Sequence, residues 1–572
     1  MKEKWKTLKH NGPIFPASYE YKNLEIIVDG KKHIVSEKLE EMLYAWAQKH
    51  TTDYIKDKVF QKNFFKCIKP LLEDDMKNSK FPEDWDFTNF ILYVEKVKAD
   101  KKLKTKEDRK KEKEEREIRK EKYGFAELNG EKTPLGNYMV EPPGLFMGRG
   151  KHPLRGTWKP RIYPEDVTIN HTLLFDIPEP PDGHKWKDVV ENKNAFWVAT
   201  WIEKATGANK RILFSASSTV NQESDKKKFT KAINLAKNID KVNTYIEKNL
   251  TNRNYYTRNV ATVTHLIAKL SIRVGDEKGE NTADTVGASS LRFEHVKVDG
   301  QKVVFDFLGK DSVRYYNEVE DLNINAVRNI KDRLKEIKKG EQLFPNITSK
   351  DVKDFLSGVM EGLTAKNFRT ATGSILLSKS LKKQIIDEKL KDNKKLEYFT
   401  DANLDVAIKL NHQSAVSEAY DKSLKNMKER LKLLKEDLKI VQLEVKEELF
   451  KAKETYSKRV EYAKEKYKGA KKKESLRRAK ETYGRKKERL ERKIDRLKDR
   501  IANLNTKIKI KQKTRGIALG TSKLNYADPR IPVSWCKDHE VEIKRIYPAT
   551  AQAKFQWAMD VDKDFYKNYP NV

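Results

Sequence analysis

The chain has 572 residues, 37% of them hydrophobic and 10% aromatic, so it is too long for one hydrophobic core and too aromatic for a disordered chain. Its 120 Lys and Arg outnumber 86 Asp and Glu, and the net charge of +34 favours a polyanionic partner such as DNA, RNA or an anionic membrane surface. No run of about 18 apolar residues occurs, and the first residues lack the apolar core of a signal peptide, which excludes a bilayer-spanning segment. We expect about three to five structural units.

Residues that commonly hold metals are few and scattered. The two cysteines, Cys67 and Cys536, form no CxxC pair, and we expect two reduced thiols. The ten histidines include no HExxH motif and no paired Cys/His spacing. The sequence therefore predicts no structural metal.

The first part of the chain mixes helical and strand-like patterns. Residues 1–100 alternate short apolar runs with aromatic-rich helical patterns, which indicates a compact mixed unit. Residues 101–122 are almost entirely charged, and their Glu/Lys spacings of three and four favour a solvated helix able to connect two lobes. Residues 123–220 carry Pro/Gly turns and β-like runs, among them 195–202 and 210–217.

The rest of the chain is mostly helical. Helical patterns cover 225–275 and 350–415, and residues 302–310 between them predict a strand that ends in a glycine turn. Residues 421–513 hold 34 Lys and Arg against 16 Asp and Glu, so more than half of the net charge lies there. Apolar residues recur at helical spacing on both sides of a turn near Gly469, which predicts an antiparallel helical hairpin. The predicted seam consists of Leu431, Leu434, Leu438, Val441, Val445, Leu490, Ile494, Leu497, Ile501, Leu504 and Ile508.

A basic protein that acts on a phosphodiester without a metal needs three kinds of side chain. A nucleophile attacks phosphorus, cations hold the charge of the crowded intermediate, and an acid protonates the leaving oxygen. Tyrosine can supply the first, arginine the second, and lysine or histidine the third. Composition alone does not choose among 23 tyrosines, most of which are packing residues.

Seven segments make the choice, because together and in this order they resemble motifs of the eukaryotic type IB DNA topoisomerases. They are EPPGLFMGRGKHP (141–153), PPDGHKWK (180–187), ENTADTVGASSLRFEHV (280–296), FDFLGKDSVRYYN (305–317), GLTAKNFRT (362–370), LNHQ (410–413) and GTSKLNYADPR (520–530). The resemblance extends from near the start of the chain to near its end.

The resemblance implies an enzyme that relaxes positive and negative supercoils by nicking one strand, letting the duplex swivel and resealing it. Tyr526 matches the nucleophile that forms a 3′-phosphotyrosine. Arg273 and Arg369 match the two phosphate-holding arginines, and His412 matches the histidine that donates to a nonbridging oxygen. Lys310 matches the general acid for the 5′ oxygen, which also touches a base edge in the minor groove.

Further positions match the family's ligand contacts. The DNA contacts are Arg149, Lys210, Arg211, Lys278, Thr285, Thr364 and Lys366. Arg149, Asp311 and Asn525 match contacts to camptothecin-type drugs in the nicked complex, although Met147 and Ala527 depart from the commoner family residues.

The resemblance also implies a fold, a mixed α+β and predominantly helical chain. It is a two-lobed DNA clamp with a tyrosine-recombinase-like catalytic lobe and a protruding antiparallel coiled-coil linker. The expected parts are core subdomain I (1–17 and 107–220), subdomain II (18–106), the catalytic subdomain III (221–414), the linker (415–513) and a C-terminal domain (514–572) that carries Tyr526. We expect a monomer around double-stranded DNA with weak sequence preference and steep salt dependence.

No cofactor is expected, since one phosphodiester is exchanged for another of similar energy and resealing needs neither ATP nor Mg²⁺. The segment GKDS (309–312) resembles the end of a P-loop, but no glycine stands five residues before Gly309. The family is nuclear and often has a long charged N-terminal extension, whereas the core-like segment here begins almost at Met1. We therefore expect either a naturally short chain, as in a compact-genome parasite or a virus, or a shortened one.

Two alternatives remain open. A tyrosine recombinase shares the tyrosine and the basic pocket, but such enzymes usually carry an Arg-His-x-x-Arg cluster and lack a long basic hairpin before the tyrosine. A non-enzymatic DNA-binding coiled-coil protein with an inactive core is the other, and the five intact catalytic positions argue against it.

Overall fold

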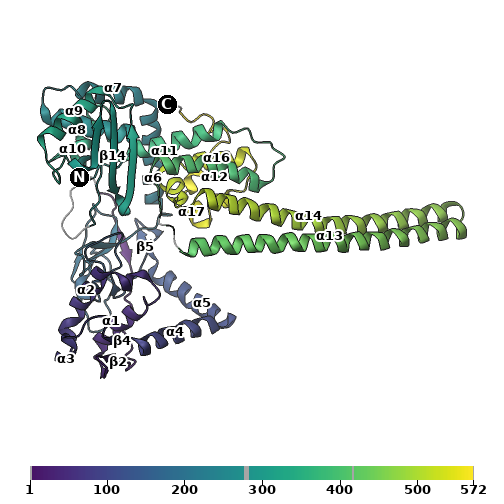
Figure 1. Ribbon diagram of the computed structural model, residues 1–572, viewed down its shortest axis with the longest axis horizontal. Helices are drawn as coiled ribbons and strands as arrows, with labels where there is room; N and C mark the ends of the chain where they lie inside the picture. Colours follow the sequence, from purple (N-terminus) through teal and green to yellow (C-terminus); the bar gives the residue numbers. More distant parts are fainter. Residues whose placement is uncertain (1–2, 276–282, 415, 417, 571–572) are drawn as a thin grey trace. The chain divides into compact units, whose positions relative to one another are not determined.

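The computed structural model describes residues 3–275, 283–414, 416 and 418–570, which form a mixed α+β protein in which helices predominate (Figure 1). The chain divides into two compact units. The first consists of residues 1–368 with 547–560, and the second of residues 369–546 with 561–572. No helix in the described part of the chain combines the length and the apolar character needed to span a bilayer.

The first unit carries all fifteen strands of the described residues, in five small sheets. The sheets have the orders β1-β5-β6, β3-β2-β4, β7-β8, β10-β9-β11-β12 and β13-β14-β15. The strands are β1 (Leu8–His10), β2 (Glu25–Val28), β3 (Lys31–Ile34), β4 (Trp85–Asp86), β5 (Phe125–Leu128), β6 (Glu131–Pro134), β7 (Gly144–Leu145), β8 (Trp158–Lys159), β9 (Thr168–Asn170), β10 (Asp188–Val190), β11 (Trp197–Ile202), β12 (Asn209–Leu213), β13 (Val296–Asp299), β14 (Lys302–Gly309) and β15 (Val313–Val319).

The helices of the first unit cover these sheets or form a core of their own. They are α1 (Glu37–Ala47), α2 (Lys58–Ile68), α3 (Asp74–Lys77), α4 (Thr88–Leu103), α5 (Lys106–Tyr123), α6 (Thr219–Lys237), α7 (Ile239–Asn249), α8 (Tyr255–Leu270), α9 (Ile324–Glu336), α10 (Ser349–Ser357) and α17 (Ala549–Lys554). Helix α8 buries ten of its sixteen residues, so it is a central element of this unit. The expected strands at 195–202, 210–217 and 302–310 correspond to β11, β12 and β14.

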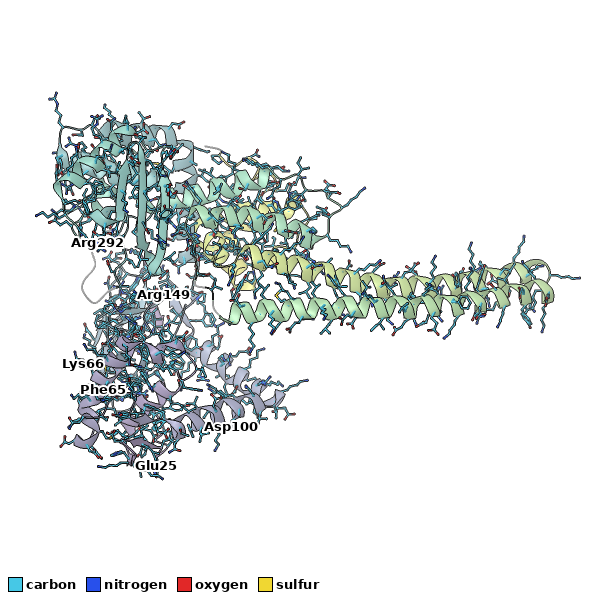
Figure 2. The ribbon with its side chains drawn as sticks, in the orientation of Figure 1. Glu25, Phe65, Lys66, Asp100, Arg149 and Arg292 are labelled. Carbon is cyan, nitrogen blue, oxygen red and sulfur yellow. The ribbon has the colours of Figure 1, made fainter. Side chains whose placement is uncertain are left out.

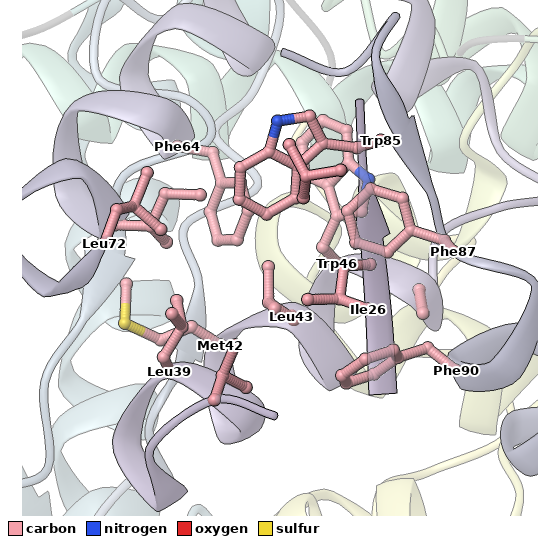
Figure 3. Close-up of a cluster of buried hydrophobic side chains, with 14 of the residues drawn as sticks. Ile26, Leu39, Met42, Leu43, Trp46, Phe64, Leu72, Trp85, Phe87 and Phe90 are labelled. Carbon is pink, nitrogen blue, oxygen red and sulfur yellow. The ribbon is translucent and has the colours of Figure 1, made fainter. Parts of the chain in front are cut away.

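An aromatic core joins α1, α2 and α4 to the sheet β3-β2-β4 (Figure 3). The ring of Trp46 stacks on Phe64, with centroids 4.8 Å apart and planes 16° from parallel, and Phe90 is fully buried beside Ile26 in the same cluster. Large rings of this kind supply much of the apolar area that a small unit buries. The mixture of helix and strand expected for residues 1–100 is found, but Trp5 and Leu8 belong to a different core, with Ile169 and Trp201, so these residues do not form one unit.

The charged run at 101–122 is helical but contains a break. Helix α4 ends at Leu103, and α5 starts at Lys106 after Thr105, whose hydroxyl accepts a hydrogen bond from the Asp108 backbone while the Asp108 carboxylate accepts from Thr105. This capping box satisfies the first backbone donors of α5 and starts a new helix inside the charged run. Glu/Lys spacing predicted the helix, and the Thr-x-x-Asp pattern marks its beginning.

The second unit is helical. Its elements are most of α11 (Ala365–Lys382), then α12 (Asp392–Lys409), α13 (Glu418–Lys466), α14 (Gly469–Lys513), α15 (Leu519–Thr521) and α16 (Arg530–Asp538). Phe399 of α12 and Trp535 of α16 are buried with ring centroids 5.3 Å apart.

The basic segment forms the predicted hairpin. Helices α13 and α14 run side by side in Figure 1, joined by two residues before Gly469, whose φ of +56° lies in the left-handed region. Every predicted seam position is buried or half-buried, with Leu434, Val445, Leu490 and Ile508 the most covered. Long charged side chains stand off both helices along their length (Figure 2). Heptad-spaced apolar residues therefore hold the hairpin together, and its charge faces solvent.

Candidate active site

Tyr526 lies in the second unit, in a π-helical turn (Ser522–Tyr526) that follows α15. The Ala527 backbone N–H closes this turn on the Ser522 carbonyl at 2.9 Å. The tyrosine is only 8% exposed, and Ala527 and Asp528 beside it are fully buried. π-Helical turns are rare and concentrate at functional sites, where the wider turn re-aims a side chain.

Two cationic or polarisable partners flank the tyrosine ring. The Arg369 guanidinium carbon, from α11, lies 4.8 Å from the Tyr526 ring centroid. The His412 ring, just after α12, lies 5.0 Å from it at 32°. Arg369 and His412 are each 4% exposed, so water screens this charge poorly. The structure thus brings together three of the five residues predicted to act in catalysis.

Hydrogen bonds fix the two partners relative to each other. Arg369 Nη2 donates to the Leu410 carbonyl at 3.0 Å and lies 3.3 Å from His412 Nε2. His412 Nδ1 lies 3.1 Å from Ser522 Oγ. Both ring nitrogens of His412 therefore lie at hydrogen-bond distance from a polar partner, Arg369 on one side and Ser522 on the other.

The main chain around Tyr526 is held by α11, the helix that carries Arg369. The Ser374 hydroxyl lies 3.2 Å from the Tyr526 carbonyl oxygen and 2.8 Å from that of Thr370, and it accepts from the Asp528 N–H at 2.9 Å. Gly373, one residue earlier, lies where a Cβ would stand 3.3 Å from Tyr526 Cβ and from its carbonyl oxygen, close enough that the neighbours would have to move by a few tenths of an ångström. The small residue allows the helix and the nucleophile segment to approach closely.

A buried ion pair closes the other side of this segment. Asp528 is fully buried and receives a forked pair of bonds from Arg530, at 3.0 Å from Nε and 2.7 Å from Nη2. The two-point geometry of guanidinium and carboxylate orients both groups. The chain directions before and after Tyr526 are therefore both fixed by named contacts.

Arg273 belongs to the first unit, in the loop after α8. Its backbone carbonyl accepts from the Ala288 N–H at 2.9 Å, and the Val274 carbonyl accepts from Ser289 at 2.7 Å. Gly275, at φ +83°, and Gly287 approach so closely that a Cβ on Gly287 would meet the Gly275 nitrogen at 2.6 Å and the Arg273 oxygen at 2.7 Å. Residues 287–290, the GASS segment, thus hold the loop that carries Arg273 through backbone hydrogen bonds and close glycine packing.

Lys310 stands at the exposed tip between β14 and β15, also in the first unit. Asp311 and Ser312 beside it both have positive φ, +67° and +58°, which non-glycine residues rarely adopt. Asp311 forms an ion pair with Arg149, labelled in Figure 2, and Gly150 fits against Ser312 where no Cβ could stand. Three predicted ligand residues, Arg149, Lys310 and Asp311, are thus gathered at one turn.

Comparison of the chain with known proteins identifies the family to which it is similar. Residues 3–214 match the family described as "Eukaryotic DNA topoisomerase I, DNA binding fragment", residues 217–446 its "catalytic core", and residues 498–567 the "C-terminal topoisomerase domain". The chain is 36% identical to human DNA topoisomerase 1 over 577 residues, covering 98% of this chain and 72% of that protein. It is 35% identical to the Drosophila melanogaster enzyme, of which it spans 55%, and 36% to DNA topoisomerase 1 beta of Arabidopsis thaliana, of which it spans 59%.

The chain belongs to the eukaryotic DNA topoisomerase I family. The predicted resemblance is confirmed, and with it the enzyme class, a type IB DNA topoisomerase and thus an isomerase.

The other predicted ligand positions of this topoisomerase differ in exposure. Arg211, Lys366 and Asn525 are exposed, whereas Lys210 of β12 lies 4.0 Å from the Glu141 carboxylate. Thr285 is buried, and the Thr364 hydroxyl is 2.7 Å from Asn367 Oδ1 in the turn that begins α11. Lys278 lies outside the described residues. Their roles toward DNA or drug stay predictions.

Sequence reasoning missed the residues that position the site. Ser522, Gly373 and Ser374 hold the Tyr526 segment, and Gly287 and Ser289 hold the Arg273 loop. Gly287 and Ser289 lie inside a motif that was recognised, so a Gly–x–Ser run beside a predicted arginine loop was the available signal. Nothing in the local pattern of α11 marks Gly373, since its neighbour is 153 residues later in the chain.

The described residues contain one group whose side chains lie close enough to share a cation, His33, Glu73 and Asp75. His33 ring nitrogens lie 3.4 Å from Glu73 and 3.9 Å from Asp75, the geometry of a histidine between two carboxylates. None of the three belongs to the candidate active site. The two cysteines, as expected, are free thiols.

Proposed function

We propose that this topoisomerase relaxes positive and negative DNA supercoils through a covalent intermediate on Tyr526. The Tyr526 oxygen attacks a backbone phosphorus, a 3′-phosphotyrosine bond forms, and the bond to the 5′ oxygen breaks. The 5′ oxygen takes up a proton and the phenol proton passes to solvent. Once the duplex has swivelled, the 5′ hydroxyl attacks the phosphotyrosine and restores the phosphodiester.

The observation that carries this proposal is the buried contact of Arg369 with the Tyr526 ring and with His412. Preorganised cationic donors in a poorly hydrated site stabilise charge that develops on phosphoryl oxygens far better than the same groups in water. We assign Arg369 and Arg273 to the nonbridging oxygens, His412 to a further hydrogen bond there, and Lys310 to protonation of the 5′ oxygen. Side chains thus supply each of the three roles that the reaction requires.

The finer organisation is part of the same proposal. We assign residues 1–220 to a DNA-binding cap made of subdomains I and II, 221–414 to a tyrosine-recombinase-like catalytic lobe, 415–513 to the linker and 514–572 to the C-terminal domain. A monomer of this kind would surround a supercoiled duplex in the nucleus. The basic hairpin would slow rotation by phosphate attraction without reading bases. Arg149, Asp311 and Asn525 would contact a camptothecin-type inhibitor at the nick.

A plasmid-relaxation assay in EDTA, without ATP, tests the proposal. We expect both positively and negatively supercoiled plasmid to relax, and denaturant quenching to trap protein on the 3′ end of a nicked strand. Failure with either sign, or protein trapped on the 5′ end, would contradict it. Exchange of strands between two duplexes without relaxation would instead favour the tyrosine-recombinase alternative.

A further inference from the structure

A polar cavity of about 500 Å³ lies in the first unit beside α8 and α9, whose labels stand close together in Figure 1. Its walls include Tyr255, Arg258 and Asn259 from α8 and Arg328, Asn329 and Arg333 from α9. The proposed reaction uses none of these residues. The volume falls in the range of small-molecule sites, which bury most of a ligand of this size.

Asn259 is a largely buried polar residue of this cavity for whose side chain the described fold supplies no hydrogen-bond partner. It is 6% exposed and lines the cavity, and no residue in the described part of the chain forms a hydrogen bond with its side-chain amide. Buried side-chain amides nearly always have a protein or ordered-water partner, so the Asn259 amide is left to bond whatever fills the cavity, water or a ligand. By contrast, Asn329 donates to the Leu250 carbonyl at 3.0 Å and to Thr262 Oγ1 at 2.9 Å, so that wall is already fixed.

Arg333 contributes a second buried donor. Its Nε donates to the Leu343 carbonyl at 2.8 Å and its Nη1 to the Tyr255 hydroxyl at 2.6 Å and to Glu336. Its Nη2 has no acceptor among the residues that the structure describes, although the side chain is 90% covered. Buried guanidinium N–H groups bind oxygen acceptors, and the bidentate partners they favour are carboxylate and phosphate.

The cavity carries an excess of positive charge. Its four cations are Arg258, Arg328, Arg333 and Lys335, and its two carboxylates are Asp332 and Glu336. Lys335 lies 3.4 Å from Asp332, and Arg333 pairs with Glu336. Two cations therefore have no carboxylate partner among the described residues: Arg328, which is exposed and donates to the Asn325 amide oxygen, and Arg258, which is half-buried with its guanidinium 5.3 Å from the Tyr255 ring.

We propose that this cavity is a binding site for a small organic phosphate of about the size of a nucleoside monophosphate. The two excess cations match the double charge of a phosphate monoester. The Asn259 amide offers a donor and an acceptor to a hydroxyl or base edge, and the half-exposed Tyr255 ring offers a flat face. Size, charge and the unused amide together favour an organic phosphate over an inorganic one.

Calorimetric titration of the full chain with AMP, adenosine and pyrophosphate, each without DNA, tests the site. We expect one saturable AMP site per chain, with adenosine and pyrophosphate at least tenfold weaker, because each supplies only part of the ligand. Asn259→Ala and Arg328→Ala should each weaken AMP binding by at least tenfold. The control Arg253→Ala removes an equal charge from an exposed neighbour that does not line the cavity and should change the affinity less than twofold.

Thermal unfolding separates loss of ligand from loss of fold. Asn259→Ala should change the stability of the apo chain little, since the amide it removes makes no hydrogen bond to the described residues and faces the cavity, while abolishing the AMP-induced rise in Tm. Equal weakening by Arg253→Ala, several weak sites that salt removes together, or no saturable AMP binding would each overturn the proposal. Tighter binding of pyrophosphate than of AMP would also overturn it, in favour of an adventitious anion site.

Discussion

The α13–α14 hairpin and the pocket around Tyr526 use positive charge in opposite ways. The hairpin segment holds a net charge of +18 on side chains that are largely solvated, some of them in exposed ion pairs such as Arg477 with Glu474. The pocket places Arg369, buried and hydrogen-bonded, against one tyrosine ring. Solvated charge attracts phosphates over a distance and is screened by salt, whereas buried charge is screened much less and acts strongly on the groups held against it. The region with the most charge is therefore not the region to which we assign the catalytic step.

The substitution with the largest expected effect on cleavage removes the nucleophile and leaves the hairpin charge in place. Tyr526→Phe deletes one oxygen and keeps the ring against Arg369 and His412, so DNA cleavage should fall by at least about 10³-fold. DNA affinity and its salt dependence should not change, because the hairpin charges remain. Single-turnover cleavage of a short duplex and fluorescence anisotropy across a salt series measure the two quantities. Cleavage that survives the change would show that another residue is the nucleophile.

The next test compares two arginines of equal charge. Arg369→Ala should lower the cleavage rate by about 10²- to 10³-fold, the range for loss of one preorganised donor to a developing charge. Arg485→Ala, on the exposed surface of α14, should change that rate less than twofold. The same single-turnover assay reports both. Similar effects from the two variants would mean that long-range attraction, not contact, sets the rate.

Substitutions of two glycines should have smaller effects, and their effects on stability should be opposite in sign to each other. Gly373→Ala places a methyl 3.3 Å from Tyr526 and should slow cleavage by about tenfold and cost about 1–3 kcal/mol of stability, as overpacking does. Gly484→Ala, inside α14 with nothing within 4 Å, should stabilise the hairpin by about 0.5–1 kcal/mol through helix propensity. Denaturant unfolding measures both. A destabilised Gly484→Ala chain would contradict the open surroundings of that residue.

The smallest effect concerns the tip of the hairpin. Replacing Lys471, Lys472 and Lys473 together by Gln should weaken DNA binding only a few-fold and reduce the slope of log affinity against log salt by up to about 0.9 per lost phosphate contact. Cleavage at saturating enzyme should not change. Anisotropy titrations at several salt concentrations give the slope. A slope equal to that of the parent chain would remove the hairpin tip from the DNA-binding surface.

These two regions also differ in how far the sequence predicts them. The hairpin follows from local rules, because heptad-spaced apolar residues such as Leu434 and Leu490 identify both the seam and the antiparallel pairing. The nucleophile follows from a motif, SKLNYADPR, not from any periodicity. The contacts that position it do not follow from either, because Gly373 and Ser374 meet Tyr526 only through the tertiary fold. The cavity with Asn259 is hidden for the same reason, since its walls come from segments some seventy residues apart.

The placement of Arg369, Gly373 and Ser374 on one helix has a consequence for robustness. Arg369 contacts the Tyr526 ring, Gly373 admits its main chain, and the Ser374 hydroxyl lies at its carbonyl. A thermal shift of α11 therefore carries the cation and the tyrosine segment together, so their separation varies less than the position of either. The distance between Arg369 and Tyr526 is therefore little affected by small movements of the helices around them. Such common displacement lets a long hairpin precede the nucleophile in the chain without disturbing its alignment with Arg369.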